Sequence, residues 1–184
     1  MDALKLLTTR KSTKKLSAPA PNKAQLDQIL QAALHAPDHG KLQPYHFVIV
    51  ENDGLTTLAE LLKSAVAELN LGEERLQKAA KITTRAPMII GVVAKIQPEI
   101  AKVPAWEQMM TAGAATYAIQ LAANALGFDN VWLTGPWIEG STLRKAFGCR
   151  EKDKIIALVM IGSAEEKTER APRNNDITDF VHYL

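Results

Sequence analysis

Residues 88–94 read Met-Ile-Ile-Gly-Val-Val-Ala, a continuous apolar run that directly follows Pro87. A run of this length without alternating polar residues is typical of a strand that is buried on both faces of a sheet. Further apolar stretches at residues 45–50, 131–134 and 155–161 predict additional strands. We therefore expect a sheet of four or five strands, with residues 88–94 as the best candidate for a central one.

Hydrophobic periodicity predicts helices between these strands. Asn22 and Gln25 have the spacing of a capping box, and apolar side chains then recur with the period of a helix. This helix should end near His35, because Pro37 disfavours helical geometry at the residue before it. Further helices are expected at residues 2–8, 55–69, 73–83 and 104–126, and after a cap at Ser141.

The predicted helix at residues 104–126 is apolar on most of its sides. Small residues are concentrated within it, in the sequence Thr-Ala-Gly-Ala-Ala at positions 111–115. A helix that is apolar all round is normally covered all round. We expect this one to lie either in the core or beneath a second subunit.

Composition places the chain among ordinary globular proteins. Its 184 residues are 47% hydrophobic and 23% charged, which excludes a disordered, fibrous or coiled-coil protein and favours one domain over residues 1–184. Cys149 is the only cysteine, so we expect no internal disulfide, no thiolate zinc site and a structural thiol. No apolar run approaches the ~18 residues of a membrane span, so we expect a cytoplasmic protein without a membrane partner.

Positive charge is concentrated at the N-terminus. Residues 1–24 contain six basic side chains and one acidic one, a local charge of +5 in a chain whose net charge is +2. Such a block indicates an anionic partner: nucleic acid, a membrane surface or a phosphate-bearing ligand. A solvated, lysine-rich surface is the alternative. The block contains no aromatic residue, which disfavours stacking on single-stranded nucleic acid, and residues 10–14 (Arg-Lys-Ser-Thr-Lys) form a plausible phosphate cradle.

Common catalytic signatures are absent from the sequence. There is no G-x-G-x-x-G, P-loop, G-x-S-x-G or H-E-x-x-H motif. His35 and His39 are four residues apart, but Pro37 lies between them and should break a shared helical face, so we expect no metal. A metal-dependent hydrolase built on His35, His39 and His46, and nucleic-acid binding through the basic block, are the alternatives.

Two N-terminal motifs together resemble the flavin-dependent nitroreductases. The chain starts Asp-Ala-Leu-Lys-Leu-Leu at residues 2–7 and continues with Arg-x-Ser-Thr-Lys at residues 10–14. The loop at residues 36–45, Ala-Pro-Asp-His-Gly-Lys-Leu-Gln-Pro-Tyr, is similar to the Ala-Pro-Ser-x-x-Asn-x-Gln-Pro-Trp segment of that family. Asp38, Lys41 and Tyr45 stand where the family has Ser, Asn and Trp, which bears on substrate range and ring contacts.

The resemblance continues along the chain. It includes Arg-Ala-Pro at residues 85–87, the small-residue helix after Trp106, and Gly-Phe at 127–128 before Val-Trp at 131–132. It covers about residues 1–162 in the family's order and is strongest to the short YdjA-like NAD(P)H nitroreductases, whereas the tail at 163–184 matches poorly. The implied fold is α+β, with a mixed, mainly antiparallel central sheet flanked by helices and the long helix at a dimer interface.

The implied activity is that of an FMN-dependent oxidoreductase. It would be a homodimeric flavoprotein that takes hydride from NADH or NADPH and reduces nitroaromatic, quinone or similar small-molecule acceptors in a ping-pong cycle. No side chain need form a bond, because the chemistry takes place on the cofactor. A non-catalytic flavin-binding or flavin-storage protein is the alternative.

The resemblance also assigns site residues. Arg10, Lys11 and Ser12 would hold the FMN phosphate and ribityl chain, and Lys14 the pyrimidine edge of the ring. His35 and His39 would reach the flavin of the other subunit. The remaining flavin contacts would be Trp132, Leu133 and Thr134. The contacts with the nicotinamide dinucleotide would be Ala122, Ala123, Asn124, Ala125, Leu126 and Gly127. Whether Arg170 or Arg173 of the tail reaches a phosphate is left open.

Overall fold

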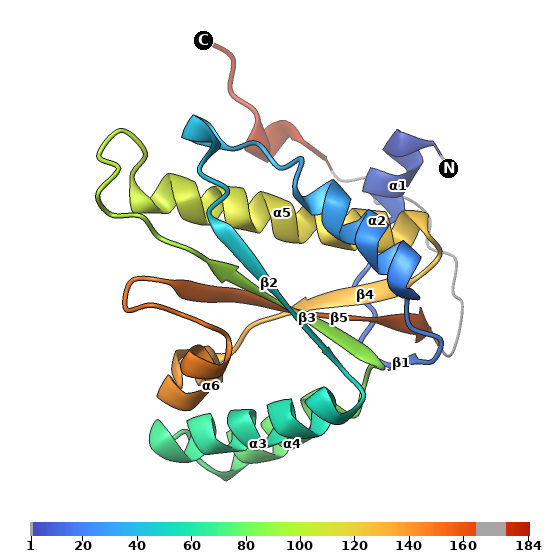
Figure 1. The fold of residues 1–184 in the computed structure, drawn as a ribbon. Helices are drawn as coiled ribbons and strands as arrows, with labels where there is room; N and C mark the ends of the chain where they lie inside the picture. The colour runs from blue at the N-terminus through green and yellow to red at the C-terminus, as the bar shows by residue number, and fades with distance from the viewer. Residues whose placement is uncertain (1, 165–175) are drawn as a thin grey trace.

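A five-stranded sheet lies between two layers of helices (Figure 1). The structure is a computed structural model that describes residues 2–164 and 176–184. Strand β3 (Met88–Ala94) lies between β2 (Tyr45–Glu51) and β5 (Lys154–Ala164). Strands β4 (Asp129–Leu133) and β1 (Leu16–Ser17) also pair with β5, and each pairing among the described residues is antiparallel. The expected α+β class with a mainly antiparallel sheet is confirmed.

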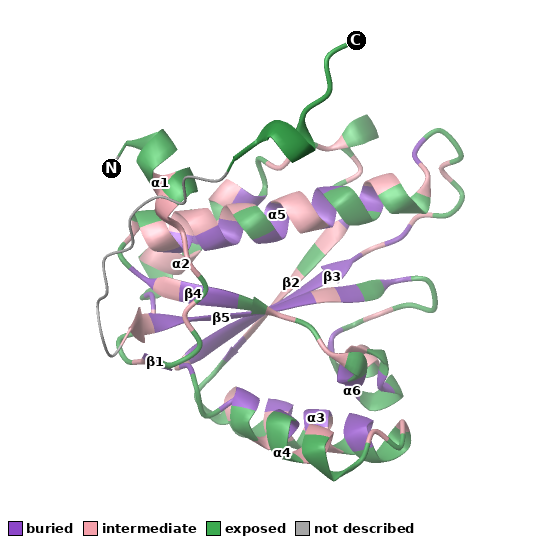
Figure 2. Ribbon diagram, turned by 180° about the vertical axis from the view of Figure 1, so that it is seen from behind, coloured by how far each residue is buried: buried purple, intermediate pink, exposed green. Residues whose placement is uncertain are grey.

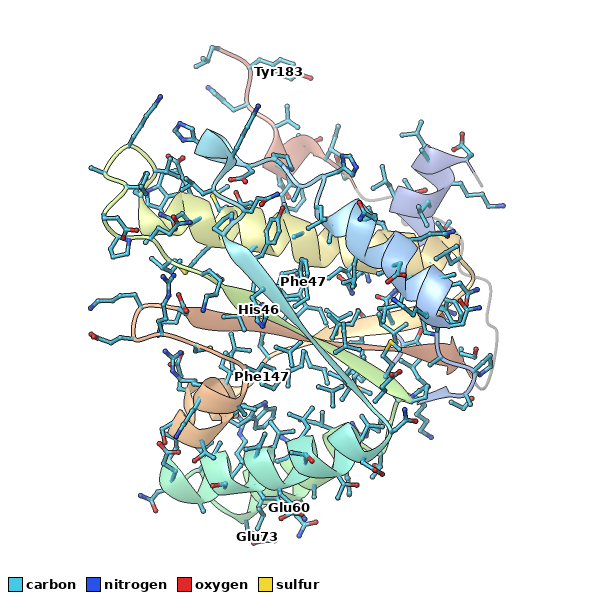
Figure 3. The ribbon with its side chains drawn as sticks, in the orientation of Figure 1. His46, Phe47, Glu60, Glu73, Phe147 and Tyr183 are labelled. Atoms are coloured by element: carbon cyan, nitrogen blue, oxygen red, sulfur yellow. The ribbon has the colours of Figure 1, made fainter. Side chains whose placement is uncertain are left out.

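Strand β3 is the centre of the core, as its apolar run predicts. All seven of its residues are buried, and Figure 2 shows the strand among other buried segments of the sheet. Because side chains alternate along a strand, Ile89 and Val93 pack into one layer, and Ile90 and Val92 into the other. Gly91 is required for packing, since a Cβ at this position would collide with the ring of Phe147, which follows α6 (Ser141–Ala146; Figure 3).

Helices cover both faces of the sheet (Figure 1). The first layer holds α5 (Ala105–Ala125), α2 (Lys23–Ala33) and, at its edge, α1 (Ala3–Thr9). The second holds α3 (Asp53–Glu68), α4 (Glu73–Ile82) and α6 (Ser141–Ala146). Short 3₁₀ turns occur at His39–Lys41, Pro136–Glu139 and Thr178–Phe180. None of the helices in the described part of the chain is long and apolar enough to cross a membrane.

The local signals at α2 are confirmed. The side chain of Asn22 accepts a hydrogen bond from the Gln25 N–H at 3.0 Å, and the Gln25 side chain accepts one from the Asn22 N–H at 3.0 Å. The helix ends at Ala33, two residues before the predicted His35. The capping box and the proline together therefore bound this helix.

The prediction that Ser141 caps α6 is wrong. The cap residue is Gly140, and Ser141 is the first residue of the helix. The Ser141 N–H donates to the carboxylate of Glu68 on α3, at 2.9 Å from Oε2, so a side chain from a distant helix satisfies this terminus. A Cβ at Gly140 would collide with Ala65, which explains the glycine.

Strand β1 and the ends of two other strands depart from expectation. Two residues are too few to show periodicity, and β1 exists because it pairs with Ser163 and Ala164 at the end of β5. Strand β4 starts at Asp129, two residues before the predicted start, and β5 extends beyond the predicted segment at both ends. Arg170 and Arg173 lie outside the described residues.

Candidate functional site

The basic segment after α1 lies along the start of β4. Asp2 caps α1 by accepting a hydrogen bond from the Lys5 N–H at 2.9 Å, and the chain turns out of the helix at Arg10. Thr13 then donates twice: its N–H to the Asn130 carbonyl at 3.0 Å, and its hydroxyl to the Asp129 carboxylate at 3.2 Å. These bonds fix residues 10–14 beside the sheet edge.

Arg10 carries an unsatisfied buried donor. Its Nη1 is buried and has no hydrogen-bond partner in the part of the chain that the structure describes. An unpaired donor of this kind costs about 1–3 kcal/mol, and more when it is charged. Lys11 is half-buried, and Ser12 and Lys14 are exposed. A dianionic phosphate matches this set of donors in charge and in hydrogen-bonding chemistry.

Strand β4 brings the predicted Trp132 close to that segment. Asn130 is buried and exchanges two hydrogen bonds with Gln120 of α5, at 2.8 and 2.9 Å. Trp132 is two residues further along, about 7 Å away, and lies on the same face of the strand. Trp132 is 37% exposed, and its Nε1 donates to the Ile156 carbonyl at 2.9 Å. Leu133 packs into the core on the opposite face, and Thr134 is exposed just beyond the strand.

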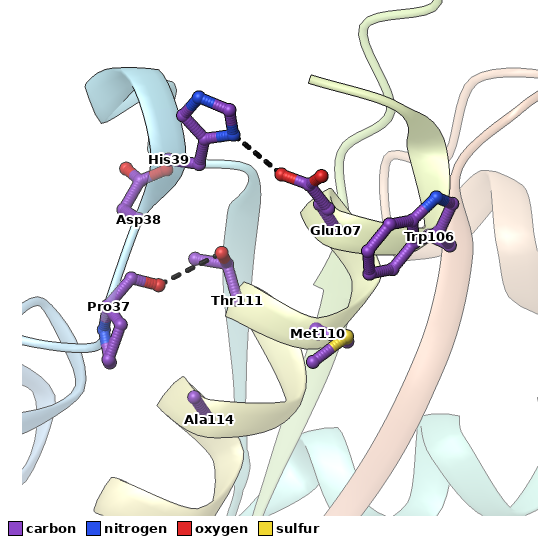
Figure 4. Close-up of a pocket in the computed structure, with 8 residues that line it drawn as sticks. All are labelled: Pro37, Asp38, His39, Trp106, Glu107, Met110, Thr111 and Ala114. Carbon is purple, nitrogen blue, oxygen red and sulfur yellow. Dashed lines mark hydrogen bonds and ion pairs between the residues drawn. The ribbon is translucent and has the colours of Figure 1, made fainter. Parts of the chain in front are cut away.

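A pocket of about 420 Å³ lies at the other end of α5 (Figure 4). One wall is the loop before β2, and the other is the first half of α5. Two side-chain bonds join the walls: His39 Nδ1 lies 2.6 Å from Glu107 Oε2, and the Thr111 hydroxyl donates to the Pro37 carbonyl at 3.0 Å. The residues that line it are Pro37, Asp38, His39, Trp106, Glu107, Met110, Thr111 and Ala114.

The loop beside this pocket has an unusual backbone. Gly40, Lys41 and Gln43 have φ values of 77°, 55° and 47°. Positive φ at a residue other than glycine is uncommon, and such residues cluster at functional sites. The Asp38 carboxylate accepts a hydrogen bond from the Gln43 N–H at 2.7 Å, which holds the turn closed.

One protomer does not bring all the predicted flavin contacts together. The basic segment is joined to α5 through Asn130, which binds Gln120 of that helix. The pocket lies beside Glu107 and Thr111 of the same helix. At 1.5 Å per residue, Gln120 is about 14–20 Å from these two residues along the helix. In Figure 1, α1 and the 3₁₀ turn at His39–Lys41 lie near opposite ends of α5. His35 is exposed and follows the end of α2.

An apolar stripe on α5 joins the two regions. Trp106, Met110 and Tyr117 are 57%, 64% and 39% exposed, and a Cβ at Gly113 would meet no atom within 4 Å. The opposite face of the helix is buried against the sheet. Among residues 2–164 and 176–184, the helix is therefore covered on one face and exposed on the other, and its location beneath a second subunit stays a prediction. An exposed apolar stripe of this kind marks an interaction surface.

The predicted nicotinamide contacts at the end of α5 differ in burial. Ala123 is wholly buried, whereas Ala125 and Gly127 are exposed and Ala122, Asn124 and Leu126 are partly buried. Cys149 is half-buried, and burial raises the pKa of its thiol. No group of three or more His, Cys, Asp and Glu side chains among residues 2–164 and 176–184 is placed to hold a metal ion.

Sequence reasoning missed Glu107 and the pocket. Glu107 falls within a helix that the sequence predicts, but its partner His39 is 68 residues away. A carboxylate in the first turn of a helix normally interacts with the helix N-terminus. The position of Glu107 in the sequence therefore gave no separate indication of a functional site. Only the packing of the loop against α5 identifies the pair.

The chain matches one protein family and has relatives among known proteins. The model of the nitroreductase family matches residues 7–163. A Haemophilus influenzae protein, provisionally named an NAD(P)H nitroreductase, is 65% identical over 184 residues and covers all of both chains. YdjA of Escherichia coli K12, also provisionally named an NAD(P)H nitroreductase, is 42% identical with the same coverage.

Solved structures show the same fold. A nitroreductase-like family protein from Bacillus cereus superposes with a TM-score of 0.85 at 20% identity and covers 100% of this chain and 96% of its own. A nitroreductase with bound FMN from Desulfitobacterium hafniense has a TM-score of 0.69 at 24% identity, with 98% and 97% coverage. At these identities, the likeness is one of fold.

Proposed function

Because the chain belongs to the nitroreductase family, we propose that it is an FMN-dependent oxidoreductase. It takes hydride from NADH or NADPH and passes it to a nitroaromatic, quinone or similar acceptor, the two substrates occupying one site in turn in a ping-pong cycle. Bound FMN supplies the hydride-accepting and hydride-donating ring. The protein binds and orients that ring and leaves one of its faces open to substrate.

The observation that carries this proposal is the buried, unpaired Nη1 of Arg10. A phosphate monoester supplies the missing acceptor, and a charge-assisted hydrogen bond of this kind contributes about 1.5–3 kcal/mol. Lys11 and Ser12 follow on the same fixed segment and hold the phosphate and the ribityl chain. The Thr13 bonds to β4 already set the backbone of this segment.

Residues at the end of the basic segment and on β4 would hold the ring. Lys14 is exposed at the end of the basic segment, and its ammonium stabilises negative charge on the pyrimidine edge of the reduced ring. The backbone of residues 132–134 lines the ring, together with the exposed part of Trp132. Trp132 is held in place by its bond to the Ile156 carbonyl, so it forms a rigid wall.

The functional unit is a homodimer with two shared sites. Two copies of α5 that pack through their apolar stripes about a two-fold axis run antiparallel, as an isologous contact allows. The N-terminal end of one helix then lies beside the C-terminal end of the other. This arrangement would bring His39 of the partner subunit toward the Arg10 segment, from which His39 of the same protomer is separated along α5. The resemblance assigns His35 of the partner subunit to the same site.

The resemblance also assigns a site to the nicotinamide dinucleotide. We place it at the end of α5, where Ala122, Asn124, Ala125, Leu126 and Gly127 retain exposed surface. Ala123 is left out because its side chain is wholly buried.

A visible absorption spectrum of the purified protein tests the proposal. We expect a flavin spectrum that bleaches under anaerobic addition of NADPH or NADH and returns when a quinone or nitroaromatic is added. A stable flavin spectrum that neither nucleotide bleaches would indicate the flavin-storage alternative. A colourless protein that takes up no FMN would refute the proposal.

A further inference from the structure

A carboxylate–imidazole pair lies at the mouth of the α5 pocket. Figure 4 shows His39 on the loop and Glu107 in the first turn of α5, with Nδ1 and Oε2 2.6 Å apart. The side chains are 47% and 27% exposed, so the pair is partly shielded from water. At this distance, the contact is a short, charge-assisted hydrogen bond.

The bond determines which nitrogen of His39 carries a proton. An ionised carboxylate only accepts, so Nδ1 must be the donor. The neutral ring then keeps Nε2 as an acceptor, and the protonated ring offers it as a second donor. In Figure 4, the second ring nitrogen lies on the far side of the ring from Glu107, away from α5. Glu107 thus sets both the tautomer and the direction of Nε2.

The loop backbone is held by other bonds. Thr111 binds the Pro37 carbonyl at 3.0 Å, and Gln97 Nε2 donates to the Leu42 carbonyl at 3.3 Å. Asp38, the nearest other carboxylate on the loop, accepts from the Gln43 N–H. Removal of the Glu107 carboxylate therefore frees the His39 ring while these backbone contacts remain.

We propose that Glu107 is a positioning residue of the cofactor site, which acts by holding the His39 ring with Nε2 directed across the subunit interface. This inference rests on the proposed function, in which His39 contacts the flavin bound by the partner subunit. Glu107 itself touches no cofactor. It removes the rotational freedom of an exposed side chain before the cofactor binds, so that less freedom is lost on binding.

The first test is the tautomer of His39. We compare wild type, Glu107→Gln and Glu107→Ala by ¹⁵N NMR of the imidazole nitrogens, in FMN-loaded protein and in protein stripped of FMN. Wild type should show a protonated Nδ1 in both forms. Glu107→Ala should move the neutral ring of the stripped protein toward the Nε2–H tautomer, and an unchanged spectrum would overturn the proposal.

The second test is a double-variant cycle on FMN affinity, read by flavin fluorescence. Glu107→Ala should weaken binding about 3- to 10-fold, the effect of one hydrogen bond, and His39→Ala by at least as much. The double variant should lose no more than His39→Ala alone, because Glu107 acts through His39. Additive losses would overturn the proposal.

Matched controls separate this proposal from the one on which it rests. Glu74→Gln removes an exposed carboxylate that binds Lys78 on α4, and it should leave FMN affinity unchanged. Glu107→Gln keeps the side-chain shape and should fold even if Glu107→Ala does not. If wild type binds FMN and both Glu107 variants bind it equally well, this inference alone fails. If wild type binds no FMN, the proposed function fails and takes this inference with it.

Discussion

The backbone N–H of Thr13 donates a hydrogen bond to the carbonyl of Asn130 at 3.0 Å, and so joins the N-terminal basic segment to β4. Asn130 is in turn bonded twice to Gln120 of α5. The position of Arg10, three residues before Thr13, is thus set by the sheet and by the long helix. The Thr13 bonds therefore hold the backbone that carries Arg10 beside β4.

Arg10→Ala should weaken FMN binding by roughly 10- to 150-fold, because it removes a charge-assisted bond to a dianion. The free energy of unfolding of the FMN-free protein should not fall, because the guanidinium that is removed contains a buried nitrogen without a hydrogen-bond partner among the described residues. Fluorescence titration and thermal unfolding measure the two effects. Lys15→Ala, an exposed change in the same basic block, is the control. Wild-type affinity in Arg10→Ala would remove Arg10 from the phosphate site.

Lys14→Ala should lower the two-electron potential of bound FMN by roughly 20–45 mV, because a nearby ammonium stabilises the negative charge of the reduced ring. This range corresponds to about 1–2 kcal/mol, a value reduced for solvent exposure of Lys14. Spectroelectrochemical titration measures it, with Lys23→Ala, whose ammonium pairs with Asp27, as the control. Lys41, which stands at the family's Asn position, is a second candidate for an ammonium beside the ring. The Lys14→Ala/Lys41→Ala protein should therefore show a larger shift in potential than Lys14→Ala alone. Wild-type potentials in both proteins would contradict the assignment.

Tyr117→Glu should convert the dimer to monomers and release FMN. The substitution places a charge at the C-terminal end of the apolar stripe on α5, where burial at an interface would leave it unpaired. Sedimentation velocity gives the oligomeric state, and the absorption spectrum gives the flavin content. Thr56→Glu, on the exposed face of α3 in the other layer, should change neither. A wild-type monomer with full flavin occupancy would contradict the shared site.

Asp153→Asn should destabilise the protein at pH 7 by about 3 kcal/mol, because Asp153 is wholly buried and paired with Arg150 and Lys95. Burial alone would raise the pKa of this carboxyl. Hydrogen bonds from both basic side chains and from the N–H groups of Arg150 and Ile96 outweigh it and hold the pKa far below the usual value. The ionised form is therefore the form stabilised by folding.

The stabilisation by Asp153 depends on pH. The stabilisation by Asp153 is present above the unfolded pKa of about 4 and is lost as the pH falls toward the lower folded value. The difference in unfolding free energy between wild type and Asp153→Asn should therefore be largest at neutral pH and shrink below pH 4. Urea unfolding at several pH values measures it. A difference that does not change with pH would show that the Asp153 charge is not the cause.

Short-range signals in the sequence determined the elements of the fold. The capping box at Asn22 and Gln25, the proline after α2 and the seven apolar residues of β3 each act over a few residues, so they can be recognised without knowing what packs against them. The resemblance to a flavoprotein family came from motifs that are equally local. It placed Arg10 and His39 near a cofactor but said nothing of their surroundings.

Only the tertiary structure decided which groups meet. Strand β1 depends on the end of β5, and the N-terminus of α6 depends on Glu68 of α3. The bond between His39 and Glu107 joins two residues that are 68 positions apart in the chain, and the burial of Arg10 Nη1 likewise depends on how distant segments pack. Such contacts have no fixed spacing in the sequence, because they follow from how whole helices and strands pack to bury apolar surface. For the same reason, the exposed stripe on α5 became visible only when one face of that helix was already covered by the sheet.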